Sequence, residues 1–242
     1  MAKTGYNPFS RWSGRVGGNV FKVINGSQVV MPYSGVSNDR KSPAQLEVRA
    51  RFSFSHKLSK IIPFELLAGI KGNKDTRRKE LISRIYRNSA VSVDDKVYSA
   101  YLYADELVIS DGDVFYYDIT NLALADGTLT GDIRNIPDGI DRIMVMAMCS
   151  NAEGEYTSCV YTVVAVRSGA ATINLRVGGF ASGSQVQVYT VPLTLTMVGA
   201  NQLAGKTFAD ESTAENFYVL MLKNEGNYQW GRSVYGGSVT LT

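Results

Sequence analysis

Cysteine and histidine are scarce in this sequence. The chain has 242 residues but only two cysteines, Cys149 and Cys159, and one histidine, His56. So few cysteines exclude a disulfide-rich scaffold and a zinc site built from cysteine alone. A single histidine excludes metal sites that need two imidazoles and most catalytic triads that depend on histidine. We interpret His56 as a polar residue on the flank of a helix.

Long apolar runs are also missing. The opening residues 1–12 contain no apolar stretch of signal-peptide length, and no other stretch approaches the roughly 18 apolar residues of a membrane span. We therefore expect neither secretion by the usual route nor insertion in a membrane. The length is sufficient to bury a sizeable core, in one domain or in two unequal parts.

Motifs that carry catalysis are absent too. Residues 180–184 lack the order of a nucleophile elbow, and Asp111-Gly-Asp113 lacks the further oxygen ligands of a calcium loop. Most other carboxylates occur in turns, where acidic residues are common. A glycosidase pair of carboxylates leaves no mark in a sequence, so that class stays open. We predict no enzyme, no cofactor, no metal site and no small-molecule substrate.

Glycines do occur near the start, where Gly14, Gly17 and Gly18 stand beside two arginines. Their spacing fits neither a P-loop nor a dinucleotide-binding loop. Apolar, β-branched runs then flank Asn25-Gly26, and this pattern predicts a β-hairpin over about 19–32. We interpret the glycines as structural, because they precede a hairpin and no helix N-terminus follows to bind a phosphate.

Two helices are predicted next. Ser42, Pro43 and Gln45 form a capping box that opens a helix over about 43–70, kinked at Pro63. A further helix over about 75–87, with Asp75 as its candidate cap, has an apolar stripe on one side. Its other side is basic and is either a solvated face or a docking surface. The basic residues are Arg77, Arg78, Lys79, Arg84 and Arg87.

From about residue 91 the pattern changes to strands. Residues 143–149 are apolar throughout, which predicts a strand covered on both faces. Cys149 and Cys159 lie symmetrically about Gly154, so we expect a hairpin that places them side by side as reduced thiols. The other predicted strands are 97–103, 114–119, 156–166, 171–177, 185–197, 216–223 and 233–242.

These elements predict a mainly β fold. An N-terminal β-hairpin arm and short helices, in residues 1–90, precede an Ig-like antiparallel β-sandwich in residues 91–242.

The net charge of the chain changes sign at the same point. Residues 1–90 hold 17 Lys+Arg and 5 Asp+Glu, a net +12, whereas residues 91–242 hold 8 and 17, a net −9. Such a split favours contact with nucleic acid, with an acidic protein, or head-to-tail with an identical chain.

Aromatic residues supply two further candidates. Trp12, beside Arg11 and Arg15 and close to Phe21, is a candidate anchor for a neighbouring chain, because an N-terminal arm has little domain of its own to cover a large ring. The chain also has 14 tyrosines. These residues either pack across strands or form a face that binds a ligand such as a carbohydrate.

The segments Phe9-Ser-Arg-Trp-Ser-Gly-Arg-Val-Gly-Gly-Asn-Val20 and Asp39-Arg-Lys-Ser-Pro-Ala-Gln45 resemble an uncharacterised family of Bacteroidota and their tailed phages. Members begin with a Phe-Ser-Gly-Lys-Val-Gly-like segment and end in Ig-like strands. The runs Tyr218–Leu222 and Arg232–Tyr235 are similar to the family's C-terminal hairpin. The resemblance implies a structural protein of a tailed-phage virion, with no catalytic residue.

Three functions follow from these patterns. The first is a non-enzymatic virion protein, made in the host cytoplasm, that forms a ring, neck, tail or capsid-associated layer with copies of itself and other virion proteins. The second is a carbohydrate-binding or adhesion module. The third is a nucleic-acid-binding structural protein that uses the basic N-terminal part. The first and third are compatible where a neck surrounds packaged DNA.

Overall fold

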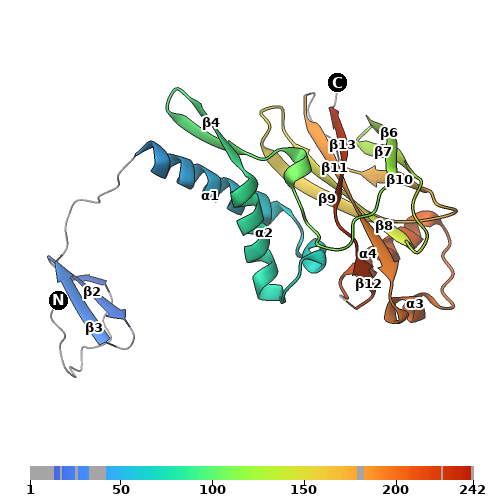
Figure 1. Ribbon diagram of the computed structural model, residues 1–242, viewed down its shortest axis with the longest axis horizontal. Helices are drawn as coiled ribbons and strands as arrows, with labels where there is room; N and C mark the ends of the chain where they lie inside the picture. The colour runs from blue at the N-terminus through green and yellow to red at the C-terminus, as the bar shows by residue number, and fades with distance from the viewer. Residues whose placement is uncertain are drawn as a thin grey trace. The chain divides into compact units, whose positions relative to one another are not determined.

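The computed structural model (Figure 1) describes residues 14–16, 18–24, 27–32, 42–178, 183–224 and 226–240. The chain forms two compact units, an N-terminal unit, Met1–Gln45, and a main unit, Leu46–Thr242. Among the residues singled out in the sequence, Arg11, Trp12, Gly17 and the Asn25-Gly26 pair lie outside the described residues.

The N-terminal unit contains a three-stranded antiparallel sheet. Strands β2 (Asn19–Ile24) and β3 (Ser27–Pro32) form the hairpin that the sequence predicted, so this element is confirmed. A third strand, β1 (Gly14–Val16), pairs with β2 and was not predicted. Gly14 has φ +139°, a conformation that side chains of L-residues rarely adopt. That value supports a structural role for this glycine.

Helices open the main unit. Helix α1 (Pro43–Ile61), the 3₁₀ helix η1 (Phe64–Gly69) and α2 (Lys74–Asn88) agree with the predicted helices, including the break at Pro63. The cap of α2 differs from the prediction. Asn73, and not Asp75, accepts a hydrogen bond from the Thr76 N–H at 3.0 Å. A neutral side-chain oxygen at this position satisfies one of the free N–H groups of the first turn.

A hairpin and two larger antiparallel sheets follow the helices. The hairpin consists of β4 (Ala90–Asp94) and β5 (Val97–Tyr101), before the short η2 (Ala104–Glu106). The smaller of the two sheets has the order β10-β7-β6, with β6 (Asp118–Ala125), β7 (Thr128–Arg134) and β10 (Ala171–Arg176). The larger has five strands in the order β12-β11-β8-β9, with β13 also paired to β11. Its strands are β8 (Arg142–Ser150), β9 (Tyr156–Ala165), β11 (Gln185–Leu195), β12 (Tyr228–Trp230) and β13 (Val234–Thr240).

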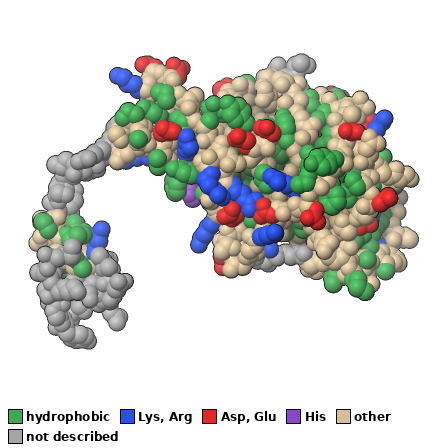
Figure 2. All heavy atoms as spheres, viewed as in Figure 1, with side chains coloured by type: hydrophobic (Ala, Val, Ile, Leu, Met, Phe, Trp, Pro, Cys, Tyr) green, Lys and Arg blue, Asp and Glu red, His purple; other side chains and the backbone are tan. Residues whose placement is uncertain are grey.

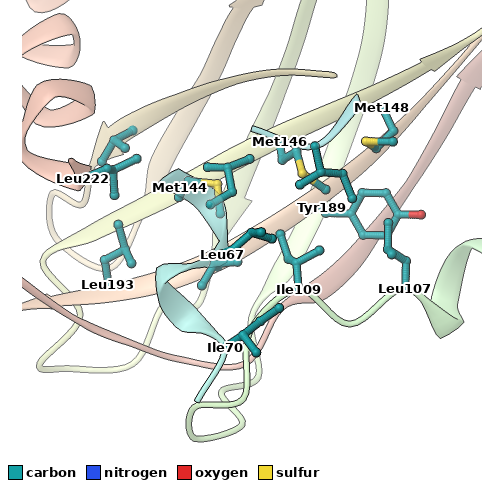
Figure 3. Close-up of a cluster of buried hydrophobic side chains, with 14 of the residues drawn as sticks. Leu67, Ile70, Leu107, Ile109, Met144, Met146, Met148, Tyr189, Leu193 and Leu222 are labelled. Atoms are coloured by element: carbon teal, nitrogen blue, oxygen red, sulfur yellow. The ribbon is translucent and has the colours of Figure 1, made fainter. Parts of the chain in front are cut away.

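Strand β8 separates two hydrophobic cores. Ile143, Val145 and Ala147 point into the core between the two sheets, while Met144 and Met146 point to the opposite face. On that face the five-stranded sheet meets residues from α1, η1, α2 and α4, including Leu67 and Leu222 (Figure 3). The prediction of a strand covered on both faces is therefore confirmed. The fold is mainly β and resembles a sandwich, with helices as an additional layer.

One predicted strand was wrong. Residues 216–222 of that predicted strand belong to helix α4 (Glu211–Leu222), where the buried residues Ala214, Tyr218, Met221 and Leu222 recur at helical spacing. Asp210 caps this helix by accepting a hydrogen bond from the Thr213 N–H at 2.7 Å. The run 218–222 that resembled a family hairpin is thus helical.

Two predicted boundaries also differ. Strand β11 ends at Leu195, because Thr196 caps a short helix, α3 (Met197–Leu203). Strand β6 begins at Asp118, whereas the sequence predicted a strand from Val114.

The expected division near residue 90 does not match the compact units. The main unit begins at Leu46, and α1 and α2 share a core with the five-stranded sheet. Leu58, Leu81 and Ile85 of these helices are almost fully buried in that core. The helices are therefore a layer of the main unit and not part of a separate N-terminal arm.

The two cysteines are free but are not side by side. The pairing of β8 with β9 places Cys149 opposite Ser158, and Cys159 opposite Met148. Neighbouring residues of a strand point to opposite faces, so Cys149 enters the core between the sheets and Cys159 contacts the helical side. Beyond the turn the strands pair one residue away from the symmetry about Gly154 that the sequence suggested, so the two cysteines do not lie opposite each other.

Candidate protein interface

The basic side of α2 was predicted as a solvated face or a docking surface, and the structure divides it. Arg77 donates from Nε to the carbonyl of Ile70 at 3.0 Å. Arg78 donates from Nη1 to the carbonyls of Ser59 and of Ile62, the latter at 3.1 Å. The carbonyls of Ser59 and Ile62 lie at the C-terminal end of helix α1, where a positive charge is favourable. Burial lowers the pKa of the Arg78 guanidinium.

Arg84 fixes the other side of α2. It donates to the Asp111 carboxylate at 2.6 Å and to the Glu80 carboxylate at 3.1 Å. The hydrogen bond with Arg84 lowers the pKa of Asp111, and the same contact raises the pKa of Arg84. Arg84 therefore connects α2 to the loop at residue 111, 27 residues further along the chain.

Lys79 and Arg87 are the exposed members of the basic set. Arg87 approaches Glu80 at 3.4 Å, a contact that solvent weakens. Arg77, Arg78 and Arg84 instead contact backbone or carboxylate groups of the main unit. The surface available to a partner on α2 is thus smaller and less basic than the sequence indicated.

The N-terminal candidates lie on the three-stranded sheet or outside the described residues. Phe21 is half-buried and lies opposite Gly14 on one side and Val30 on the other. The backbone of Arg15 pairs with Val20 in β1–β2.

The three-stranded sheet has apolar residues on both faces. Residues directly opposite each other share a face, so Phe21 and Val30 lie on one face and Val20 and Met31 on the other. All four are half-buried, and Val23 is exposed. A sheet of this pattern is typical of one that is covered on two sides.

A second apolar surface was missed by the sequence reading. The β4–β5 hairpin exposes 58% of Val93 and 63% of Val97. Tyr101 and Tyr103, also exposed, pack edge to face with ring centroids 5.4 Å apart. Only β5 was predicted, because the Asp95-Lys96 turn lacks the glycine that usually marks a two-residue hairpin.

Helix α1 adds further exposed apolar side chains in its first half. Val48 and Phe52 lie one turn apart and are both exposed, and the Phe52 ring is 4.3 Å from the His56 ring. In Figure 2 hydrophobic side chains reach the surface over α1 and the hairpin, among charged side chains. Large apolar side chains exposed in this way are typical of protein contact surfaces.

Other kinds of site have little support among the described residues. They contain no group of three or more His, Cys, Asp or Glu side chains placed to hold a metal ion. Nor is any helix within them long and apolar enough to cross a membrane. A shallow, open cavity of about 370 Å³ lies where β6 and β7 meet β13, with Tyr117, Asp118, Arg134, Asn135 and Tyr235 in its lining.

Comparisons with known proteins do not name a family. No protein-family model matches the chain, and neither a curated protein nor a solved structure is significantly similar to it.

Proposed function

We propose that this chain is a non-enzymatic structural protein of a tailed-bacteriophage virion, in a ring, neck, tail or capsid-associated layer. It binds copies of itself and neighbouring virion proteins through the N-terminal sheet and the β4–β5 hairpin. The virion is proposed from the sequence resemblance over residues 9–55 and 217–237.

The observation that carries the assembly role is the three-stranded sheet of the N-terminal unit. Its apolar side chains occupy both faces, and Val20, Phe21, Val23, Val30 and Met31 keep part of their surface exposed, whereas Val29 is buried. The exposed β4–β5 hairpin adds a second apolar surface. Apolar surfaces on small elements outside a core support binding to another protein.

The experiment has two measurements. Sedimentation velocity of the full-length protein is expected to detect oligomers that disappear when residues 1–32 are deleted. Mass spectrometry of purified phage particles and of lysate, from a host that carries the gene, is expected to find the chain enriched in particles. A monomer at all concentrations, absent from particles, would contradict the proposal.

A carbohydrate-binding role is the second candidate, because the open cavity combines tyrosine rings with amide and carboxylate groups. Asn135 donates to the Asp118 carboxylate at 2.5 Å, and Tyr235 packs on Tyr189 at 5.5 Å. Such groups suit sugar hydroxyls and sugar rings. A glycan array with the full-length protein and its Asn135→Ala variant tests this role, which requires binding that the variant loses.

Nucleic-acid binding gains less support. Three of the five basic residues on α2 contact groups of the main unit, which reduces the positive charge available to phosphates. If the basic N-terminal part binds DNA, the affinity must fall steeply with salt, because displaced counterions set the slope.

A further inference from the structure

The β4–β5 hairpin is a small element with an uncovered surface. Its register places Val91, Val93, Tyr98 and Ala100 on one face. These residues are all apolar, and none of them is fully buried. A two-stranded hairpin is marginally stable alone in water, so a contact on this surface stabilises it.

The tip of this hairpin is acidic and has an unusual backbone. Asp95 has φ 41° and Lys96 has φ 65°, in a two-residue turn that usually contains asparagine and glycine. Aspartate tolerates the left-handed region, whereas lysine there costs about 1 kcal/mol or more. The turn therefore keeps Lys96 at a position where glycine would be easier to accommodate.

The charges of the hairpin and of the N-terminal unit are opposite. Residues 90–106 contain four acidic residues and one lysine, a net −3, with two of the carboxylates at Asp94 and Asp95. Residues 1–32 contain four basic residues and no acidic one, a net +4. Lys22, in the middle of β2, is exposed. Opposite charges around two apolar patches favour their association and fix its orientation.

We propose that the β1–β3 sheet of one copy of this chain docks on the β4–β5 hairpin of a second copy. The inference rests on the proposed assembly function and names the two surfaces that meet. A second copy is the occupant because both surfaces belong to this chain and carry opposite net charges, +4 over residues 1–32 and −3 over residues 90–106. The contact joins two different patches and therefore propagates from copy to copy into a ring or filament.

The size of the sheet limits the strength of each contact. Three strands of up to six residues give a face of about 300 Å² from strand spacing and rise. A stable complex buries roughly 800 Å² per partner. A single contact is therefore weak, and a stable assembly requires each copy to make two of them, as in a closed ring.

Photo-cross-linking between isotopically distinct chains tests the docking. Full-length protein with p-benzoylphenylalanine at Val93 is prepared in ordinary and ¹⁵N-labelled forms, mixed while dilute, concentrated and irradiated. Peptides from residues 14–32 cross-linked to the hairpin, in pairs of mixed isotope, are the expected result. Pairs of the same isotope alone, or cross-links only to other segments, overturn the inference.

Charge reversal gives an independent measurement. Lys22→Glu and Asp94→Lys are each expected to raise the dissociation constant of the full-length protein several-fold, and the double variant to recover most of the loss. Exposed charges elsewhere provide matched controls, Lys57→Glu on α1 and Glu153→Lys in the β8–β9 turn. Equal effects of the controls, or no recovery in the double variant, overturn the inference.

The two proposals fail in different ways. Oligomers that form but cross-link through other segments overturn the docking and leave the assembly function standing. A protein that stays monomeric and gives no intermolecular cross-link overturns both.

Discussion

Individual arginines of α2 act within the main unit. Arg84 is mostly buried and is held between the carboxylates of Glu80 and Asp111. The sequence predicted a face of five equivalent basic residues, since Asp111 is distant in the chain and its contact with Arg84 cannot be read from local spacing. A partly buried ion pair of this kind is expected to contribute more to stability than a pair on the surface.

The Arg84–Asp111 pair predicts a pH-dependent stability. The pKa of Asp111 is below its unfolded value, so the pair stabilises the fold above about pH 4, and this contribution is lost as the pH falls through the folded pKa. Asp111→Asn is expected to lower the free energy of unfolding by about 1 kcal/mol at pH 7. Urea unfolding at several pH values measures this difference, which should vanish in acid.

The neighbouring exposed carboxylate gives the control for this prediction. Asp113→Asn leaves Asp111 and Arg84 in place and is expected to change the unfolding free energy little at any pH. A loss for Asp111→Asn that is the same in acid as at pH 7 would contradict the role of the ion pair.

The free cysteines predict slow thiol chemistry. Burial raises the pKa of Cys159 to about 12 and also raises the pKa of Cys149. Only the thiolate is nucleophilic, so iodoacetamide at pH 8 is expected to label neither residue in the folded protein and both in urea. Mass spectrometry counts the labels. A disulfide in the oxidised folded protein would show that the two side chains share a face.

At the scale of elements, strands with alternating or uniform apolar patterns were predicted best. The apolar run 143–149 predicted both strand β8 and the burial of its two faces. The capping box at Ser42 predicted the start of α1. Helix α4 was read as a strand because Val219-Leu-Met-Leu222 is a short apolar run, which fits a buried strand or a buried helix equally well.

The register between strands and the packing between elements could not be predicted from the local sequence. The position of Cys149 opposite Ser158 depends on the pairing of two strands, and the contact of β4 with β5 depends on a turn that lacks the usual residues. The sequence placed its candidate interface in the N-terminal sheet and did not find the apolar hairpin of β4 and β5.

Gly199 in helix α3 packs closely against the backbone of a neighbouring segment. A Cβ atom on Gly199 would lie 2.2 Å from the backbone oxygen of Asn227, which cannot move without disturbing the start of β12. Gly199→Ala is expected to lower the free energy of unfolding by about 1–3 kcal/mol. Chemical denaturation measures this loss of unfolding free energy. Gly226→Ala, with its nearest neighbour at 3.7 Å, is the matched control and should cost much less.

At the scale of the whole molecule, the N-terminal unit is expected to be needed for assembly and not for the fold of the main unit. Both hydrophobic cores consist of residues from Phe54 onwards. The charge split of +12 over residues 1–90 and −9 over the remainder remains a property of the chain, although some of the basic side chains are paired internally.

Deletion of residues 1–32 tests this separation. Circular dichroism is expected to find the thermal midpoint of the main unit almost unchanged, while sedimentation shows a loss of self-association. Replacing residues 1–32 by a Gly/Ser segment of equal length controls for the new terminus. A large fall in the thermal midpoint of both variants would contradict the separation.

The double-sided burial of β8 has a consequence for how the main unit melts. Alternate residues of one strand enter opposite cores, so loosening the strand on one side withdraws contacts from the other side too. The helical layer and the smaller sheet are therefore coupled through a shared backbone, and heat should disrupt them together in a single calorimetric peak.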